Sequence, residues 1–358
     1  MLRSRYNSSR ASLEDMLPSS PDMKLALSFC LLLACGGSLP AAKNLSVYAI
    51  DVEGGQATLF VTPGGDSMLV DTGWPGHDHR DALRIAAAAK KAGVKKIDTL
   101  VITHYHEDHV GGIYQLSEKL PILNFVDHGA QTETGKPAEI LYSEYASVAA
   151  KGHRIQVKPG DKIPVKNLDV TVLSSNGDVI ASALAGAGQP NPACSGSARP
   201  AADQTENGRS IGLLITFGDF RMIDMGDLTK DREYDLVCPD NKIGTIDLFL
   251  VSHHGSDLSN SAAFVHAIAP RVAIMDNGAH KGGSKEAWQT VRDTRGLIDL
   301  WQLHYAIDSD KQHNAPDTFI ANLDADCEGK WIRVEAERDG TFTVVNARNG
   351  FEKKYVKR

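Results

Sequence analysis

The amino-terminal half of the chain alternates short apolar runs with glycine-rich turns. Three such runs, at residues 45–51, 57–62 and 67–71, predict short β-strands. An alanine-rich segment at 81–92 predicts a helix that ends at Gly93, because glycine readily adopts the left-handed conformation that stops a helix. A further apolar run of β type follows at 97–102. The pattern therefore predicts three strands, one helix and a fourth strand.

The rest of the chain adds helices and hairpins. Residues 246–252 form a nearly continuous apolar run, which is typical of a strand buried on both faces. Further helices are predicted at 110–120, 137–150, 262–268 and 285–293. Hairpins are predicted at 211–224, around Gly218-Asp219, and at 331–346, around Asp339-Gly340.

One segment breaks this pattern without forming a linker between domains. Residues 186–206 are rich in Gly, Pro, Ala and Ser and contain almost no large apolar side chain, so they cannot bury a core of their own. Their position between two strands indicates a flexible surface insertion, which is either a lid near a site or a passive loop. We therefore expect residues 43–358 to form a single domain that carries this insertion.

Residues 1–42 are predicted to be an upstream extension followed by a signal, not part of the fold. The segment from Met23 to Cys35 has a positive start and an apolar core too short to span a membrane as a mature helix. Leu32-Leu-Ala-Cys35 approximates a lipobox, which would place a lipid anchor on Cys35, whereas Ala41-Ala42 suits ordinary signal cleavage. Both routes predict export to the periplasm, the cell envelope or the outside of a bacterial cell.

Composition limits the classes of partner. The 358 residues are 42% hydrophobic and 23% charged, as in ordinary soluble proteins, and their formal net charge is −7. An acidic chain argues against a dedicated nucleic-acid-binding surface, and no transmembrane domain is predicted. Beyond the signal, three cysteines can form at most one disulfide, and Cys194 could pair with Cys238; the third is Cys327.

The most informative polar cluster follows the predicted strand at 97–102. Four potential metal ligands precede Gly111-Gly112: His104, His106, Asp108 and His109. A tight turn at the end of a strand can aim alternate side chains at one point. Imidazoles two residues apart can then bind one ion, and the Asp-His pair a second. Zinc accepts both kinds of donor, and two metals a few ångströms apart form a hydrolytic site.

These residues form the HxHxDH motif of the metallo-β-lactamase superfamily, which the chain resembles from about Leu45 to about residue 280. Three other segments resemble superfamily strands, at 68–73, 222–228 and 248–256. Within the superfamily, the chain is most similar to the hydrolase domain of competence-type (ComEC/Rec2-like) proteins, on segments 51–57, 207–211 and 253–256. The resemblance implies an α+β fold, the αββα sandwich, in which two mixed sheets pack face to face with helices outside. It also implies a dinuclear hydrolase.

The resemblance assigns roles to individual residues. His104 and His106 would hold the first metal, Asp108 and His109 the second, and Asp227 would bridge both. The second metal needs one more imidazole, from His253 or His254; we favour His253, which comes first after its strand, and expect His254 to act in catalysis as a proton donor. Asp108 is expected to take part in catalysis as well as in binding. Asp71 would orient a histidine ligand. Weaker candidates for support or substrate contact are Asp51, His128, Ser175, Asn176 and His280.

Two departures from the family pattern stand out. The competence-type pattern has an acidic residue where this chain has Gln56. Many members also carry a histidine between the HxHxDH motif and the Gly-Asp strand, and residues 170–177 contain none. Ser175, Asn176 or a water could replace that ligand, or His128 or His153 could reach in from elsewhere. We therefore expect the first metal to be weakly held.

The sequence thus predicts an exported metal-dependent hydrolase with one or two zinc ions; Mn²⁺ and Fe²⁺ are alternatives. A metal-bound hydroxide would attack small-molecule or envelope phosphoesters or phosphodiesters, because a bridging Asp is typical of superfamily members that act on phosphoesters and lactones. One alternative is a lactonase or β-lactamase-type hydrolase. Another is a non-catalytic envelope binding protein with a degenerate metal site, which the missing mid-chain histidine would support.

Overall fold

Two large β-sheets form the centre of the protein. The computed structural model describes residues 44–196 and 198–357. The strands of the first sheet are β1 (Leu45–Ala49), β2 (Thr58–Val61), β3 (Ser67–Val70), β4 (Ile97–Val101), β5 (Ile122–Asp127), β6 (His153–Gln156), β18 (Ile332–Ala336), β19 (Phe342–Asn346) and β20 (Glu352–Tyr355). Their spatial order is β20-β19-β18-β1-β2-β3-β4-β5-β6. The carboxyl-terminal hairpin β18–β19 therefore extends the amino-terminal sheet through β1.

The second sheet is also mixed. Its strands are β7 (Lys162–Val165), β8 (Leu168–Ser175), β9 (Asp178–Val179), β11 (Gly212–Phe217), β12 (Phe220–Asp224), β14 (Leu248–Leu250), β15 (Val272–Met275), β16 (Asp299–His304) and β17 (Ile320–Asn322). Their order is β17-β16-β15-β14-β12-β11-β8-β7, and β9 pairs with β8. From β12 to β17 neighbouring strands run parallel, whereas β7, β8, β11 and β12 are antiparallel.

The apolar core is divided into layers, because successive residues of a strand point to opposite faces of the sheet. On β1, Val47 belongs to the core that the two sheets share, whereas Tyr48 faces the outer side of its sheet. On β14, Leu248 and Leu250 face inward and Phe249 faces outward. The two sheets therefore pack face to face, and each has a second apolar face that must be covered.

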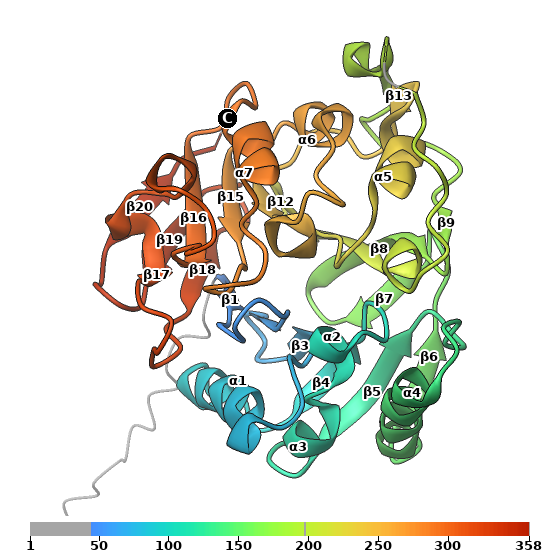
Figure 1. Ribbon diagram of the computed structural model, residues 1–358, viewed down its shortest axis with the longest axis vertical. Coiled ribbons are helices and arrows are strands. Elements are labelled where there is room, and N and C mark those ends of the chain that lie inside the picture. The colour runs from blue at the N-terminus through green and yellow to red at the C-terminus, as the bar shows by residue number, and fades with distance from the viewer. Residues whose placement is uncertain (1–43, 197, 358) are drawn as a thin grey trace, which may run out of the picture. The chain divides into compact units, whose positions relative to one another are not determined.

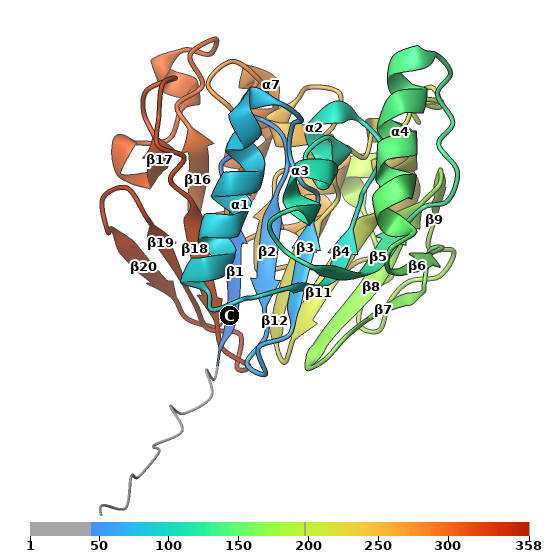
Figure 2. The same ribbon diagram turned by 90° about the horizontal axis from the view of Figure 1, so that it is seen from below.

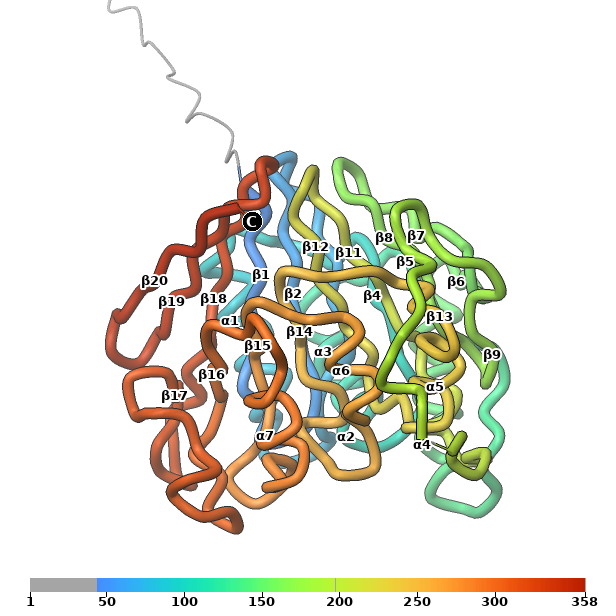
Figure 3. Tube along the Cα trace, turned by 90° about the horizontal axis from the view of Figure 1, so that it is seen from above, coloured from blue at the N-terminus to red at the C-terminus, as the bar shows by residue number. Residues whose placement is uncertain are grey.

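Helices cover both outer faces. The first sheet is covered by α1 (Arg80–Lys91), α3 (Ile113–Ser117) and α4 (Lys136–Ala149), which lie in front of β1 to β5 in Figure 2. The second is covered by α5 (Lys230–Val237), α6 (Ala262–Ile268) and α7 (Lys285–Arg292), which lie on the opposite side in Figures 1 and 3. This is the αββα sandwich of the metallo-β-lactamase fold, so the predicted fold class is confirmed.

The helix predicted after the glycines, within 110–120, is present but shorter than expected. The structure has a short α2 (Glu107–Val110), which begins inside the metal motif, and then the separate α3. Gly111 and Gly112 lie between them and pack tightly against the neighbouring loop. A Cβ atom would stand 2.3 Å from the ring of Pro75 at Gly111 and 2.1 Å from the Thr72 carbonyl oxygen at Gly112. The glycines therefore allow the motif to approach the loop after β3.

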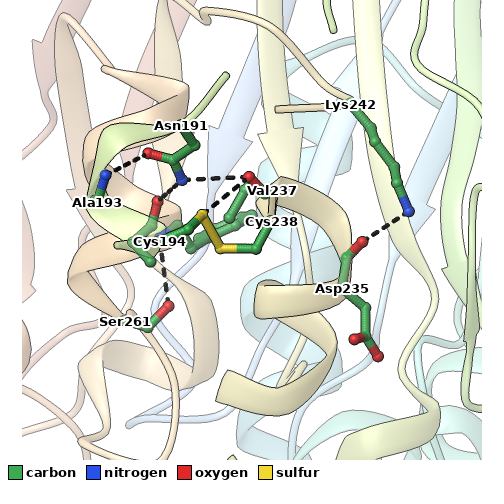
Figure 4. The surroundings of a disulfide bond; sticks show 10 residues. Asn191, Ala193, Cys194, Asp235, Val237, Cys238, Lys242 and Ser261 are labelled. Carbon is green, nitrogen blue, oxygen red and sulfur yellow. Dashed lines mark hydrogen bonds between the residues drawn. A yellow bond between two sulfur atoms is a disulfide. The ribbon is translucent and has the colours of Figure 1, made fainter. Parts of the chain in front are cut away.

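Residues 186–206 are attached to the second sheet's helical layer. Within them β10 (Gln189–Pro190) pairs with β13 (Asp240–Asn241), and a disulfide joins Cys194 to Cys238 at the end of α5, as Figure 4 shows. The Asn191 side chain donates to the carbonyls of Val237 and Ala263. The proposed Cys194–Cys238 pair is thus confirmed, while the segment's flexibility and lid role stay predictions.

The remaining elements are short 3₁₀ turns: η1 (His77–His79), η2 (Pro192–Cys194), η3 (Asn207–Arg209), η4 (Ser252–Gly255), η5 (Lys311–His313) and η6 (Asp317–Phe319). Across residues 44–196 and 198–357, no helix has the length and apolar character needed to cross a membrane. The predicted signal and the lipid anchor at Cys35 lie outside the described residues.

Candidate metal centre

Four chain segments bring the predicted ligands together at the ends of strands. Asp71 directly follows β3, and residues 104–109 follow β4, which pairs with β3 in parallel. Asp227 follows β12, and His253 and His254 lie in η4 after β14, which pairs with β12 in parallel. Loops at the carboxyl ends of parallel strands are where α/β sheets commonly build their sites.

The first group of potential ligands consists of His104, His106 and Asp227. One ligand atom from each residue lies within 4.8 Å of the others. His104 Nε2 lies 3.1 Å from His106 Nδ1 and 3.9 Å from Asp227 Oδ2. His104 is fully buried, whereas His106 lines an open cleft. These donors suit a cation with an accessible side.

The second group consists of Asp108, His109, Asp227 and His254, all of them buried. His254 Nε2 lies 3.2 Å from both Asp108 Oδ2 and His109 Nε2. His109 Nε2 lies 3.3 Å from Asp108 Oδ2. Two imidazoles and two carboxylates therefore point at one small volume, as in four-coordinate zinc sites.

Asp227 belongs to both groups because its two oxygens face opposite sides. Oδ1 lies 3.1 Å from His109 Nε2 and 3.4 Å from His254 Nε2. Oδ2 faces His104 at 3.9 Å and His253 at 3.2 Å. This geometry suits the bridging role predicted for Asp227.

From the sequence, His253 was expected to be the ligand and His254 the catalytic proton donor. The arrangement of the pair favours the reverse of this assignment. His254 is buried and its Nε2 lies inside the second group, whereas His253 belongs to neither group and lines the cleft. Both residues have a positive φ of 54°. Non-glycine residues rarely adopt that conformation, and it turns the neighbouring imidazoles toward different oxygens of Asp227. His254 is therefore the better placed ligand, and His253 the better placed substrate contact.

The hydrogen bonds of His109 leave one buried oxygen of the centre without a partner, and a cation bound there would satisfy it. Asp71 Oδ2 lies 2.7 Å from His109 Nδ1, and Asp71 also accepts from the backbone and hydroxyl of Thr103. When the ring of His109 is neutral and carries its proton at Nδ1, it turns only a lone pair toward Asp227 Oδ1. That buried oxygen has no hydrogen-bond partner. Asp71 is thus placed to orient His109, as predicted, and the lone pairs converge as metal ligands do.

The pKa values of the carboxylates and imidazoles in the centre also favour a bound cation. Burial alone would raise the pKa of Asp227 and Asp108, but the surrounding imidazoles, His109 foremost, hold both values well below the ordinary one. Burial alone would lower the pKa of His109, but Asp227 and Asp108 outweigh it and raise the value. Ionised carboxylates therefore draw positive charge into the centre. A divalent cation supplies that charge when the imidazoles are neutral, so these residues fit the metal.

Two acidic residues near the centre were not identified from the sequence. Glu133 Oε1 lies 3.1 Å from His106 Nε2, and Asp276 Oδ2 lies 3.4 Å from His254 Nδ1. Both are placed to hold a ring from the side opposite the cation, as outer partners of metal-bound histidines do. Nothing in the local sequence around either residue resembles a motif. Only the packing of their loops brings them here.

The weaker candidates lie elsewhere. His128 is buried against Glu206, at 2.9 Å from Nε2 to Oε2. Ser175 Oγ donates to the Val157 carbonyl, Asn176 accepts from Arg209, and the exposed His280 faces Asp308. Asp51 belongs to a separate cluster with His304. Among the described residues, neither His128 nor the surface residue His153 joins the first group, so neither histidine replaces the missing mid-chain ligand there.

Gln56 has a structural partner that explains the departure at this position. Its Nε2 donates to both oxygens of Asp224, each at 2.9 Å. Burial and the nearby charge of Asp71 raise the pKa of Asp224 to about 7. An acidic residue at position 56 would face this buried carboxyl, whereas the amide of glutamine donates to it.

An open cleft of about 430 Å³ lies over the centre. The residues that line the cleft include the apolar Trp74, Tyr105 and Leu141 and the polar His106, Glu107, Asp108, Glu133, Asp227, His253 and Lys281. The Lys281 ammonium contacts Asp108 Oδ2 and lies 4.8 Å from the ring centre of Trp74. Neither Lys281 nor Trp74 was identified from the sequence. The cleft can therefore present a cation, an imidazole and an aromatic face to a small anionic substrate.

Several known proteins are similar to this chain. Residues 51–197 match the model of the metallo-beta-lactamase superfamily. The chain is 28% identical to ComE operon protein 3 of Bacillus subtilis over 189 residues, which cover 52% of this chain and 20% of that protein. It is 25% identical to recombination protein 2 of Haemophilus influenzae over 261 residues, 71% of this chain and 27% of that protein. The chain thus spans about a quarter of the length of these relatives.

Among solved structures, the metallo-beta-lactamase fold protein YhfI from Bacillus subtilis aligns with a TM-score of 0.42 and 15% sequence identity. The alignment covers 72% of this chain and 96% of YhfI.

Proposed function

Because the chain carries a metallo-β-lactamase superfamily domain with clustered metal-type ligands, we propose that it is an exported metallo-hydrolase of phosphoesters or phosphodiesters. One observation carries the proposal: Asp227 offers one oxygen to each of two ligand groups. A carboxylate in that position can bridge two cations. A pair of bridged cations suits phosphoryl transfer, in which both the attacking and the leaving oxygen must be stabilised.

The residues of the proposed centre divide into two sets. His104, His106 and Asp227 would hold one zinc ion, and Asp108, His109, His254 and Asp227 the other. When bound, the cations lower the pKa of water and stabilise the negative charge that develops on the substrate.

The residues of the cleft would bind and orient the substrate. Lys281 Nζ can contact a non-bridging phosphoryl oxygen, since it reaches the rim of the centre at Asp108. His253 can donate a hydrogen bond to the leaving oxygen, and Ser259 Oγ, 3.2 Å from His253 Nδ1, would fix its ring. The apolar lining residues Trp74 and Leu141 can hold the organic group of the ester.

The substrate is proposed to be small or to belong to the cell envelope. The net charge of −7 disfavours long nucleic acids. The competence-type relatives at modest identity support a cell-envelope location, and the amino-terminal signal predicted at 1–42 supports export.

A substrate panel tests the proposal. The zinc-loaded wild type is assayed on bis-p-nitrophenyl phosphate, on nitrocefin and on simple lactones, together with an Asp227→Asn variant. We expect turnover of the phosphodiester alone and a loss of at least about 100-fold in the variant, which can no longer bridge two cations with full charge. Turnover of nitrocefin or lactones only would refute phosphoester hydrolysis. Failure to hydrolyse any of them would point to a binding protein.

A further inference from the structure

A second cluster of metal-type side chains lies apart from the centre described above. It consists of Asp51, Glu53, His304 and Cys327, whose ligand atoms all lie within 4.8 Å of one another. The two acids come from the loop after β1, His304 ends β16, and Cys327 follows β17. We propose that this cluster binds one further zinc-type cation and thereby fixes the loop that supports the hydrolytic centre.

The distances within the cluster match a metal coordination shell. His304 Nε2 lies 2.9 Å from Asp51 Oδ1, 3.2 Å from Glu53 Oε2 and 3.7 Å from Cys327 Sγ. Four ligands at the usual zinc bond lengths, placed tetrahedrally, lie about 3.3–3.7 Å apart. Imidazole, carboxylate and thiolate are all zinc donors, and this mixture is unlike the oxygen-only sets that Ca²⁺ and Mg²⁺ prefer.

Arg84 holds the carboxylates without occupying the oxygens that face His304. Its Nη1 donates to Asp51 Oδ2 at 2.9 Å and to Glu53 Oε1 at 3.0 Å. The other oxygen of each acid points at His304 Nε2. The guanidinium Nη2 also donates to the Cys327 carbonyl and lies 3.6 Å from Cys327 Sγ. Arg84 is thus placed as an outer partner that orients the carboxylates and offsets part of the charge that three anionic ligands bring.

The position of the imidazole depends on this cluster. His304 and Asp51 are fully buried, and His304 Nδ1 has no hydrogen-bond partner. The ring is therefore oriented through Nε2 alone, which points into the cluster. Cys327 is the free cysteine of residues 44–196 and 198–357, since Cys194 and Cys238 are bonded to each other.

The loop between Asp51 and Gln56 links the two sites. At Gly55 a Cβ atom would stand 2.4 Å from the Asp108 carbonyl oxygen, and at Gly54 it would stand 2.8 Å from Lys281 Cβ. The backbone N–H of Gln56 donates to that Asp108 carbonyl. A cation held by Asp51 and Glu53 would fix one end of a loop whose other end packs against Asp108 and Lys281. The role is structural and does not depend on which substrate the enzyme hydrolyses.

Cobalt substitution of the full chain tests the proposal, because a thiolate bound to Co²⁺ gives an intense near-ultraviolet charge-transfer band. The hydrolytic centre contains only imidazoles and carboxylates and gives no such band. We expect the band in the wild type and in His106→Ala, and its loss in Cys327→Ser. Zinc content should fall by one ion per chain in Cys327→Ser. Glu53→Gln, a milder change at a partly exposed acid, should weaken zinc binding at this cluster about tenfold.

Two results would overturn the inference. One is the absence of a thiolate band in the cobalt-loaded wild type, a measurement that needs no variant to fold. The other is a band that persists in Cys327→Ser, which would place the thiolate elsewhere. Neither result bears on phosphoester hydrolysis at the first centre.

Discussion

His253 and His254 are neighbours in the chain, yet their imidazoles face different oxygens of Asp227. A sequence shows that two histidines follow a strand but not which one turns inward. Here two consecutive residues with positive φ decide it. Backbone geometry of this rare kind is strained in non-glycine residues and is commonly kept where it serves a site.

The pair can be separated by mutation. In His254→Ala the second ligand group loses an imidazole, so we expect zinc content to fall by about one ion per chain and activity to be lost. In His253→Ala we expect zinc content to be retained and kcat to fall about 100-fold, because only a hydrogen bond to the leaving group is removed. Metal analysis beside steady-state kinetics measures both. Metal loss in His253→Ala with retention in His254→Ala would restore the original sequence-based assignment.

Lys281 provides a second test at the residue scale. Removing its charge in Lys281→Ala should raise KM for bis-p-nitrophenyl phosphate about tenfold or more, because a charge-assisted contact to phosphate contributes about 1.5–3 kcal/mol. Lys281→Arg is the matched control and should keep most of the affinity. If KM is unchanged in Lys281→Ala, the lysine does not bind the substrate and its only role here is the ion pair with Asp108.

The sequence predicted the residues with motif spacing and missed those without it. The cluster at 104–109 and Asp71 could be found because ligand spacing and a preceding strand agree, and their atoms do converge. Glu133, Asp276 and Lys281 stand alone in their loops, and no local pattern distinguishes them from surface charges. Their positions follow from loop packing over long sequence separations.

At the scale of elements, strong periodicity was a better guide than isolated apolar runs. The helices α1, α6 and α7 and the hairpins β11–β12 and β18–β19 lie close to their predicted positions. The helix predicted after Gly111 and Gly112 is present as the short α3, and the close packing of these glycines separates it from α2. Strands β15, β16 and β17 were not predicted, since buried parallel strands are short apolar runs without alternation.

The disulfide between Cys194 and Cys238 ties residues 186–206 to α5, and its contribution can be measured. It closes a loop with a sequence separation of 44, for which chain-entropy arguments give about 4 kcal/mol. We expect the double variant Cys194→Ser/Cys238→Ser to lose about 2–4 kcal/mol in the free energy of unfolding while it keeps its zinc. Reduction of the wild type should give the same loss. An unchanged stability would mean that the segment is held by its other contacts.

At the scale of the whole molecule, buried acids make stability depend on pH. Burial raises the pKa of Glu233 to about 7 from the ordinary value of 4.5. This side chain joins α5 to the start of α6 by accepting from the backbone of Asn260 and Ser261. Between these two pH values the folded protein holds a proton that the unfolded chain has lost. Its contribution to stability therefore falls as pH rises from about 4.5 to 7.

A neutral replacement isolates that effect. In Glu233→Gln the group no longer titrates, and the loss of one acceptor adds an offset that does not vary with pH. Relative to the wild type, we expect the free energy of unfolding of the variant to gain about 3 kcal/mol between pH 4.5 and 7.5. Urea denaturation across this range gives the difference. A constant difference between the two proteins would show that Glu233 titrates normally.

The arrangement of the whole molecule rests on segments distant in sequence that meet at one edge of the sandwich. The αββα class could be predicted because the motif resembles a family with that fold, and three apolar layers confirm it. The cluster around Asp51 and His304 could not be predicted, because Asp51 and His304 are 253 residues apart and the strand that carries His304 was not identified.

The anomalous scattering of zinc in crystals of the full chain tests the central claim most directly. Apart from the zinc proposed at the cluster of Asp51 and His304, we expect two peaks joined by the Asp227 carboxylate, one beside His104 and His106 and the other among Asp108, His109 and His254. A map with no peak at either position, from crystals grown with excess zinc, would contradict the two-cation centre and the hydrolase proposed from it.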